Sequence, residues 1–379
     1  MDQKNKSQRN KTIDFPLDSA EGKAYAARTL KPCRKALTLD GVLDQVLLGD
    51  SLKLMEKLPK GFADLLIVDP PYNLAKDYHG NQFQPKSFEQ YREYTLAWLK
   101  AALPLLKPTA SIYVCCDWKS SLIIGEVLHE LLHVRNRITW QREKGRGASA
   151  NWKNGMEDVW FATIGNEYTF NLDAVKIRRK VIAPYRQDGA PKDWEETAEG
   201  NFRNTCPSNF WDDISIPYWS MPENTAHPTQ KPEKLIAKLL LASSNPGDVV
   251  LDPFAGSGTT AVTAKKLGRH FVTIEQNELY CAWAQKRLEM ADADPSIQGF
   301  ADGVFWERNT WTGQRSNQEK ASTKPAKKQE AKPAQAAKKP AKKQETKPAR
   351  AAKKPTKKQE TKPARAAKEP AKKSGKSKK

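Results

Sequence analysis

Short apolar runs alternate with amphipathic stretches along most of the chain. The runs predict buried strands at residues 45–48, 64–68, 111–116, 136–141, 248–251 and 270–274. Apolar residues at helical spacing predict helices at residues 51–58, 89–106, 122–132, 235–243, 260–267 and 279–290. Ser51 is the expected N-cap of the first helix, and Lys107-Pro108 is expected to end the second. Strands that alternate with helices in this rhythm predict an α/β fold with a doubly wound, mostly parallel sheet.

The regular pattern breaks in two places. Residues 142–225 mix Gly, Asn, Pro, Trp and charged residues without a steady period. Residues 324–379 repeat a 15-residue unit, KPAKKQEAKPAQAAK in its first copy, in which no apolar residue is larger than Ala or Pro. Because such a segment cannot bury a core, we expect this tail to be disordered.

The positive charge of the chain is concentrated in the tail. The 379 residues include 64 Lys and Arg and 44 Asp and Glu, a net charge of +20. Residues 324–379 hold 22 of the basic and 4 of the acidic residues, so the rest of the chain has a net charge of only +2. The tail is similar to the tails of linker histones and bacterial nucleoid proteins, which implies nonspecific phosphate binding. A solubilising role is the alternative.

Several other kinds of site find no support in the sequence. The five cysteines are odd in number and lack CxxC spacing, which indicates neither a disulfide framework nor a zinc site. His129 and His133 would share a helix face without a third ligand, so we expect no metal. No apolar run approaches the ~20 residues that span a bilayer, and the polar N-terminus has no signal core. We therefore expect a cytoplasmic, nucleoid-associated protein.

Two loops that each follow a buried strand carry the most informative residues. Asp69-Pro70-Pro71-Tyr72 follows the strand at 64–68, and residues 252–260 (DPFAGSGTT) follow the strand at 248–251. Open α/β sheets bind ligands in the crevice outside the carboxyl ends of their strands, so both loops are candidates for a ligand site. Residues 227–232 (HPTQKP) lie between them in the sequence.

These three motifs resemble those of the S-adenosylmethionine-dependent DNA amino-methyltransferases, over roughly residues 40–290. In that family the DPPY loop is catalytic, and the FxGxG loop and the HPTxKP segment hold the cofactor. A catalytic loop that precedes the cofactor loop is the permuted motif order of the β class. The resemblance implies a Rossmann-like fold, S-adenosyl-L-methionine as cofactor, and double-stranded DNA as partner of a monomer or homodimer in a restriction-modification-like role.

Asp69, Pro70 and Tyr72 are the expected catalytic residues. The exocyclic nitrogen of adenine is a poor nucleophile because its lone pair is conjugated into the ring. Two acceptors aimed at its hydrogens, the Asp69 carboxylate and the Pro70 carbonyl, would favour the tetrahedral geometry that attacks a methyl sulfonium. Tyr72 offers an aromatic face to a base rotated out of the duplex. Without the other motifs, the same four residues would suit an ordinary turn after a strand.

The expected cofactor site combines the two later motifs with strand ends. Gly256 and Gly258 let the backbone turn sharply and approach a ligand, and amides that begin the next helix can hold the methionyl carboxylate. Glu275 ends a strand, where an acidic residue commonly accepts hydrogen bonds from ribose hydroxyls. The full expected set is Asp50, Thr229, Gln230, Lys231, Asp252, Phe254, Gly256, Gly258, Thr259, Thr260 and Glu275.

Basic residues in the irregular region, with tryptophans interleaved, are the expected DNA contacts. Some should bind phosphate, and one or two should read guanine edges. For any single one of them, a solvated loop position is the alternative. The set is Arg142, Lys144, Arg146, Lys176, Arg178, Arg179, Arg186 and Arg203.

The motifs divide the chain into five expected parts. These are a polar N-terminal arm (1–40), a catalytic half (41–143), a target-recognition region (144–225), a cofactor-binding half (226–310) and a disordered basic tail (311–379).

Three functions remain open at this point. The expected one is methyl transfer to N6 of adenine in DNA. The first alternative is methyl transfer to N4 of cytosine, whose enzymes share the motif but often have Ser in place of Asp69. The second is a nucleoid-associated DNA-binding protein with a vestigial enzyme fold. The tail supports this last reading. It is opposed by four intact motif residues, which are Asp69, Tyr72, Gly256 and Gly258.

Overall fold

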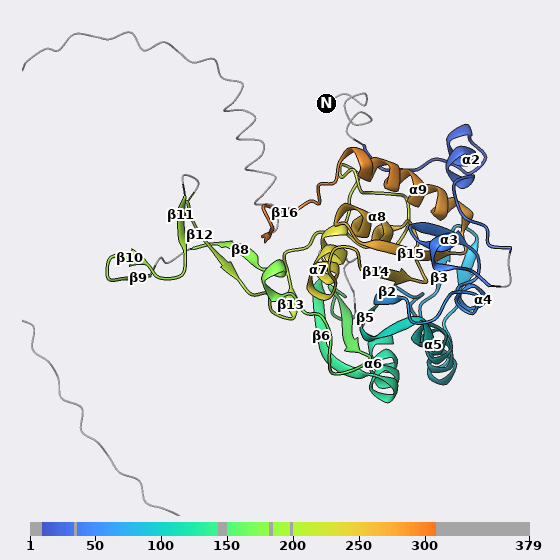
Figure 1. The fold of residues 1–379 in the computed structure, drawn as a ribbon, viewed down its shortest axis with the longest axis horizontal. Helices are drawn as coiled ribbons and strands as arrows, with labels where there is room; N and C mark the ends of the chain where they lie inside the picture. The colour runs from blue at the N-terminus through green and yellow to red at the C-terminus, as the bar shows by residue number, and fades with distance from the viewer. Residues whose placement is uncertain (1–9, 34–35, 143–149, 182–184, 198–199, 308–379) are drawn as a thin grey trace, which may run out of the picture. The chain divides into compact units, whose positions relative to one another are not determined.

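The computed structural model describes residues 10–33, 36–142, 150–181, 185–197 and 200–307 (Figure 1). Among these residues, eight strands form a central sheet in the order β1-β15-β14-β2-β5-β7-β6-β13. The strands are Gln45–Leu48 (β1), His270–Glu275 (β15), Val249–Asp252 (β14), Ala63–Val68 (β2), Leu106–Cys116 (β5), Met156–Thr163 (β7), His133–Gln141 (β6) and Phe210–Trp211 (β13). The strands from β1 to β5 in this order are parallel, and only β7 runs antiparallel to its neighbours. The predicted mostly parallel sheet is confirmed.

Helices cover both faces of this sheet (Figure 1). Successive residues of a strand point to opposite faces, so in β2 Leu66 and Val68 pack in one apolar layer and Leu65 and Ile67 in the other. The first layer contains α3 (Leu39–Val42), α4 (Ser51–Met55), α5 (Phe88–Ala102) and α6 (Ser120–Leu131). The second contains α7 (Glu233–Ser243), α8 (Thr259–Lys266) and α9 (Glu278–Ala293). This is the doubly wound arrangement that the pattern predicted.

A second, smaller sheet packs on α7. Its strands, in the order β11-β12-β8-β17-β16, are Glu195–Thr197, Gly200–Thr205, Ile177–Lys180, Val304–Trp306 and Phe300–Ala301. Ile177 and Phe305 of this sheet share an apolar cluster with Ala237 and Ala242 of α7. The sheet therefore joins a strand from the predicted target-recognition region to a hairpin from the end of the predicted cofactor-binding half.

Shorter elements complete the described chain. They are α2 (Ala20–Ala26), β3 (Lys76–Tyr78), β4 (Asn81–Phe83), the 3-10 turns η1 (Leu103–Leu105) and η2 (Leu172–Val175), and the hairpin strands β9 (Arg186–Gln187) and β10 (Ala190–Pro191). Tyr25 and Ala26 of α2 pack against Ala282 of α9, and the Tyr25 hydroxyl donates to Glu289 Oε1 at 2.9 Å. This part of the predicted polar arm is thus anchored on α9.

The ends of two predicted helices differ from the structure. Asp50, rather than Ser51, caps α4, because its carboxylate accepts the backbone N–H of Lys53. The helix predicted at 89–106 ends at Ala102, and Lys107-Pro108 lies inside β5. The pairing of β5 with β2 is irregular between Leu106 and Ser111 of β5. Proline is tolerated at position 108 because its missing N–H removes no hydrogen bond from the β2–β5 ladder.

The strand β7 was not predicted, although it lies between β5 and β6 in the central sheet. Most of its residues are buried on both faces, so the sequence lacks the polar–apolar alternation that marks a half-exposed strand. The range 144–225 therefore supplies two strands of the central sheet, β7 and β13, in addition to its part of the smaller sheet.

Candidate active site

A cavity of about 280 Å³ opens at the carboxyl ends of β2, β14 and β15. Parallel strands bring these ends to one edge of the sheet, so loops distant in the sequence meet there. Of the predicted catalytic and cofactor residues, those lining the cavity are Asp50, Asp69, Pro70, Tyr72, Thr229, Gln230, Lys231, Asp252, Phe254, Gly256, Thr259, Thr260 and Glu275. Asp50 lines it while capping α4.

Asp69, at the end of β2, is bound to Lys231. The Lys231 ammonium donates to both carboxylate oxygens of Asp69, each at 2.7 Å. Lys231 was expected to bind the cofactor, yet its charge lies against the predicted catalytic carboxylate. Burial opposes a charge on Lys231, but the carboxylates of Asp69 and Glu157 outweigh burial and raise the pKa of Lys231 above its ordinary value. Lys231 therefore carries a positive charge.

The Tyr72 hydroxyl lies between two carboxylates. It donates to Asp69 Oδ1 at 3.0 Å, and Glu157 Oε2, at 3.2 Å, is a second acceptor for the same proton. Burial, followed by the two negative charges, raises the pKa of Tyr72 well above its ordinary value, so it remains a neutral donor. Lys231 Nζ lies over the Tyr72 ring, 5.1 Å from its centroid. One face of the Tyr72 ring therefore lies against the lysine ammonium.

Glu157 and Arg142 complete this polar group. Glu157 is on β7 with its side chain 5 % exposed, and its Oε1 accepts from Arg142 Nη1. Its Oε2 is 3.4 Å from Lys231 Nζ. Glu157 is not among the predicted site residues, and Arg142 was predicted to bind DNA. A carboxylate within a buried strand would have indicated Glu157, but the sequence pattern did not predict β7 as a strand.

Gly256 and Glu275 also line the cavity and contact each other. The Gly256 N–H donates to Glu275 Oε2 at 2.8 Å, and the Asn277 N–H donates to Glu275 Oε1 at 2.8 Å. Burial raises the pKa of Glu275 to about 7 in spite of these hydrogen bonds. Burial also raises the pKa of Asp252 to about 7, although its carboxylate accepts the Phe254 N–H.

The two glycines of the loop have different surroundings. Gly256 has φ +53°, and a Cβ there would lie 3.1 Å from His227 Nε2 in the cavity wall. Gly258 has φ +79°, and a Cβ there would lie 2.5 Å from the Cβ of Ala284 on α9. Gly258 does not line the cavity, and its lack of a side chain permits close packing of the start of α8 on α9. Its role in cofactor binding stays a prediction.

His227 belongs to the HPTQKP motif, although it is not among the predicted site residues. Its ring lines the cavity and packs edge-on against Tyr280, with centroids 4.4 Å apart. Burial and then the nearby charge of Lys231 lower the pKa of His227 to about 3. The imidazole is therefore neutral and forms part of the cavity wall.

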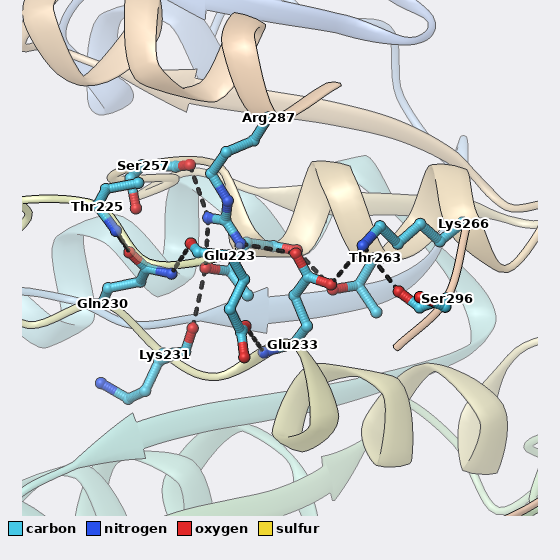
Figure 2. A network of polar contacts seen from close by, with 11 residues as sticks. Glu223, Thr225, Gln230, Lys231, Glu233, Ser257, Thr263, Lys266, Arg287 and Ser296 are labelled. Atoms are coloured by element: carbon cyan, nitrogen blue, oxygen red, sulfur yellow. Dashed lines mark hydrogen bonds and ion pairs between the residues drawn. The ribbon is translucent and has the colours of Figure 1, made fainter. Parts of the chain in front are cut away.

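The HPTQKP segment is braced by its own side chains (Figure 2). Gln230 Oε1 accepts from the backbone and the hydroxyl of Thr225, at 2.9 and 2.7 Å, and Gln230 Nε2 donates to the Glu223 carbonyl at 2.7 Å. The Lys231 carbonyl accepts from the Thr259 hydroxyl at 3.0 Å, which ties this segment to the start of α8. Gln230 thus shapes the cavity wall chiefly by holding its own loop.

Five of the predicted DNA contacts lie on or beside the smaller sheet. Each forms an ion pair with a carboxylate at 2.7–3.3 Å: Lys176 with Asp173, Arg178 with Glu195, Arg179 with Glu307, Arg186 with Glu196 and Arg203 with Asp193. Except for Arg178, whose side chain is only 16 % exposed, the basic side chains of these pairs are at least one-third exposed, and exposed pairs contribute little to stability. Binding of DNA by these residues stays a prediction. Lys144, Arg146 and the repeat tail lie outside the described residues.

Within the described residues, no group of three His, Cys, Asp or Glu side chains is placed to hold a metal ion. None of the helices in the same ranges combines the length and the apolar character needed to cross a bilayer.

Comparison with known proteins places the fold and the cavity in a family. A family described as DNA methylase matches residues 63–286, which include β2, β14 and the loops of the cavity. The chain belongs to this DNA methylase family. The type II methyltransferase M.HpaI of Haemophilus parainfluenzae is 35% identical over 251 residues, which cover 65% of this chain and 75% of that protein.

Two other similarities extend the comparison. The DNA adenine methyltransferase YhdJ of Escherichia coli (strain K12) is 33% identical over 255 residues, which cover 64% of this chain and 82% of that protein. A crystal structure of the M1.HpyAVI-SAM complex has 23% sequence identity and a TM-score of 0.45, and it covers 64% of this chain and 98% of that one.

Proposed function

We propose that this DNA methylase transfers a methyl group from S-adenosylmethionine to the exocyclic N6 of adenine in double-stranded DNA. The observation that carries the proposal is a single cavity that holds both the Asp69 carboxylate and the Gly256 loop. An acceptor for an amino group thus faces the predicted cofactor loop. The relative YhdJ is named a DNA adenine methyltransferase, which favours adenine over cytosine as the target base.

The residues around the glycine loop of the cavity fit this cofactor. Gly256 has no side chain where a Cβ would approach His227, and Glu275 offers carboxylate oxygens that can accept from ribose hydroxyls. The first turn of α8 begins at Thr259 and carries amides suited to a carboxylate. S-adenosylmethionine supplies an electrophilic methyl group on a sulfonium, whose sulfur keeps the bonding electrons when the methyl leaves.

Asp69 and Pro70 prepare the target nitrogen. The carboxylate and the backbone carbonyl would accept its two hydrogens and draw its lone pair out of conjugation with the ring. A strong base is unnecessary before the transfer, because the nitrogen becomes acidic once it carries the extra methyl group. Its proton then leaves to Asp69 or to water, and positioning supplies most of the effect.

A labelled-methyl assay tests the proposal. The protein is incubated with unmethylated DNA and methyl-labelled S-adenosylmethionine, the DNA is digested to nucleosides, and the labelled nucleoside is identified. We expect the label in N6-methyldeoxyadenosine. Label in N4-methyldeoxycytidine would replace adenine by cytosine, and DNA binding without any incorporation would favour the vestigial-enzyme alternative.

A further inference from the structure

The Lys231 ammonium occupies the place that the target amino group needs. It donates to both oxygens of Asp69 at 2.7 Å and lies over the ring of Tyr72. Tyr72 and Lys231 already supply three hydrogen bonds to the Asp69 carboxylate, so a target amino group that donates to Asp69 competes with the ammonium for its oxygens. The described arrangement is therefore a resting one, in which Lys231 holds the acceptor that the base needs.

A displaced Lys231 ammonium needs another anionic partner. Its side chain is only 7 % exposed, and a buried charge that loses its partner costs several kcal/mol. Glu157 Oε2 is already 3.4 Å from Nζ, just beyond hydrogen-bond length. Arg142 holds the other oxygen of Glu157 and so keeps Oε2 directed toward Lys231. A small shift of the ammonium thus replaces one ion pair by another.

We propose that Glu157 is a positioning residue for the methyl transfer, because it takes over the Lys231 ammonium when the target amino group binds Asp69. This inference rests on the proposed function. When Lys231 moves to Glu157 Oε2, the Tyr72 hydroxyl retains Asp69 Oδ1 as its acceptor. Asp69 Oδ2 is then open to the target amino group. The exchange moves hydrogen bonds only, and no covalent bond changes.

The variant Glu157→Gln tests this role. Glutamine keeps the size of the side chain and can still accept from Arg142, but it no longer attracts the ammonium. Lys231 should then stay on Asp69, so kcat should fall about 10- to 100-fold, less than the ~100- to 1,000-fold cost of losing a direct transition-state contact. S-adenosylmethionine should bind within about twofold of the wild-type affinity, because Glu157 does not line the cavity and its partners are Lys231, Tyr72 and Arg142.

Asp158→Asn is the matched control. The next side chain along β7 points away from this group: Asp158 accepts from Ser121 and Thr139 at 2.8 and 2.9 Å. It is as deeply buried as Glu157. This control should keep kcat close to wild type. An equal loss of kcat in both variants would mean that Glu157 only stabilises β7, and would overturn the inference.

A double-mutant cycle with Lys231→Met separates the proposed role from a structural one. If Glu157 acts by holding Lys231, then Glu157→Gln should lower the single-turnover rate at least tenfold less when the lysine is absent. Equal effects in both backgrounds would refute the inference. If the Lys231→Met rate is too low to measure, the same four proteins can be compared by their affinity for target DNA in the presence of S-adenosylhomocysteine. Glu157→Gln should again have a smaller effect on this affinity when Lys231 is replaced by Met.

The activity of the wild-type protein distinguishes a failure of this inference from a failure of the proposed function. Wild-type protein that methylates DNA, together with a Glu157→Gln variant of normal kcat, would overturn the role of Glu157 alone. Wild-type protein that methylates no DNA would overturn the proposed function itself.

Discussion

Arg287 of α9 donates to Glu233, the first residue of α7, across 54 positions of sequence. Arg287 Nη2 is 3.0 Å from Glu233 Oε1, and the two side chains are 1 % and 5 % exposed. Arg287 Nη1 also donates to the Ser257 carbonyl at 2.9 Å and to the Thr259 hydroxyl at 3.0 Å (Figure 2). One buried guanidinium therefore joins the glycine loop to the helix that follows the HPTQKP segment.

We expect Arg287→Met to lower the free energy of unfolding by about 3 kcal/mol, because it leaves a buried carboxylate with fewer partners. Lys266 still pairs with Glu233 at 2.8 Å, so the Glu233 carboxylate keeps one cationic partner. We therefore expect a loss of stability at the lower end of the range for a broken buried ion pair. Urea unfolding measures the change. Arg28→Met is the control, because the Arg28–Glu289 pair is exposed and its loss should not be measurable. Equal stability of the two variants would contradict the assigned role of Arg287.

Asp69→Ala should abolish methyl transfer and leave cofactor binding largely intact. The Asp69 carboxylate contacts Lys231 and Tyr72, whereas Glu275 contacts the Gly256 backbone of the predicted cofactor loop. Loss of a preorganised charged acceptor should reduce kcat by at least ~100-fold. Single-turnover rates and calorimetric titration with S-adenosylmethionine measure the two effects. Turnover near the wild-type rate would rule out the catalytic role of Asp69.

Valine should affect cofactor binding at one loop glycine and the stability of the fold at the other. Gly256→Val should weaken cofactor binding and preserve the circular dichroism spectrum, because its side chain would enter the cavity beside His227. Gly258→Val should instead lower the free energy of unfolding by several kcal/mol, because its Cβ would meet Ala284 at 2.5 Å. Calorimetry and urea unfolding distinguish the two. Unchanged cofactor affinity in Gly256→Val would move the cofactor site elsewhere.

Stability without cofactor should fall as the pH rises from about 4.5 to about 7. Burial raises the pKa of Glu275 from 4.5 to about 7, so the folded protein binds more protons than the unfolded chain in this window. The penalty is absent below pH 4.5 and complete above about 7. Thermal unfolding of Glu275→Gln should show a shallower decline than the wild type. Burial also raises the pKa of Asp252 and of Glu223 to about 7, so both contribute to the remaining decline, whereas His227, whose pKa burial lowers to about 3, opposes it. An unchanged slope would show that Glu275 does not titrate there.

Cofactor affinity should change with pH in the opposite direction. Ribose hydroxyls donate to the ionised carboxylate, so the affinity for S-adenosylmethionine should increase as the pH rises through about 7, and this increase should be smaller in Glu275→Gln. Calorimetric titration at several pH values measures it. A pH-independent affinity in the wild-type protein would separate Glu275 from the cofactor.

Deletion of residues 324–379 should weaken DNA binding without changing the methylated sequence or the turnover number. These residues carry 22 of the 64 basic side chains and only 4 acidic ones. Counterion release by lysines falls steeply with salt, so the truncated protein should show a smaller slope of log affinity against log salt concentration. It should also methylate distant sites on long DNA less processively. An identical salt slope would favour the solubilising role, and an altered target sequence would place the tail in recognition.

Local patterns in the sequence were sufficient to predict the parallel core, and nearly all of the predicted catalytic and cofactor residues line the cavity. A buried strand followed by a tight loop is recognisable because apolar runs, prolines and glycines act through neighbouring residues. Asp69 and Gly256 were therefore placed at strand ends before their distance in space was known. The same reasoning failed for β7, because a strand buried on both faces has no alternation to detect.

Only the tertiary structure decided which charges face one another. Lys231 reaches Asp69 across 162 positions, and Glu157 joins them from an antiparallel strand that no local pattern marked. Gly256 and Gly258, two residues apart, were assigned the same role, yet one lines the cavity and the other packs on α9. Such roles depend on long-range packing, because the partner of a buried side chain is set by the arrangement of strands and helices rather than by its neighbours in sequence.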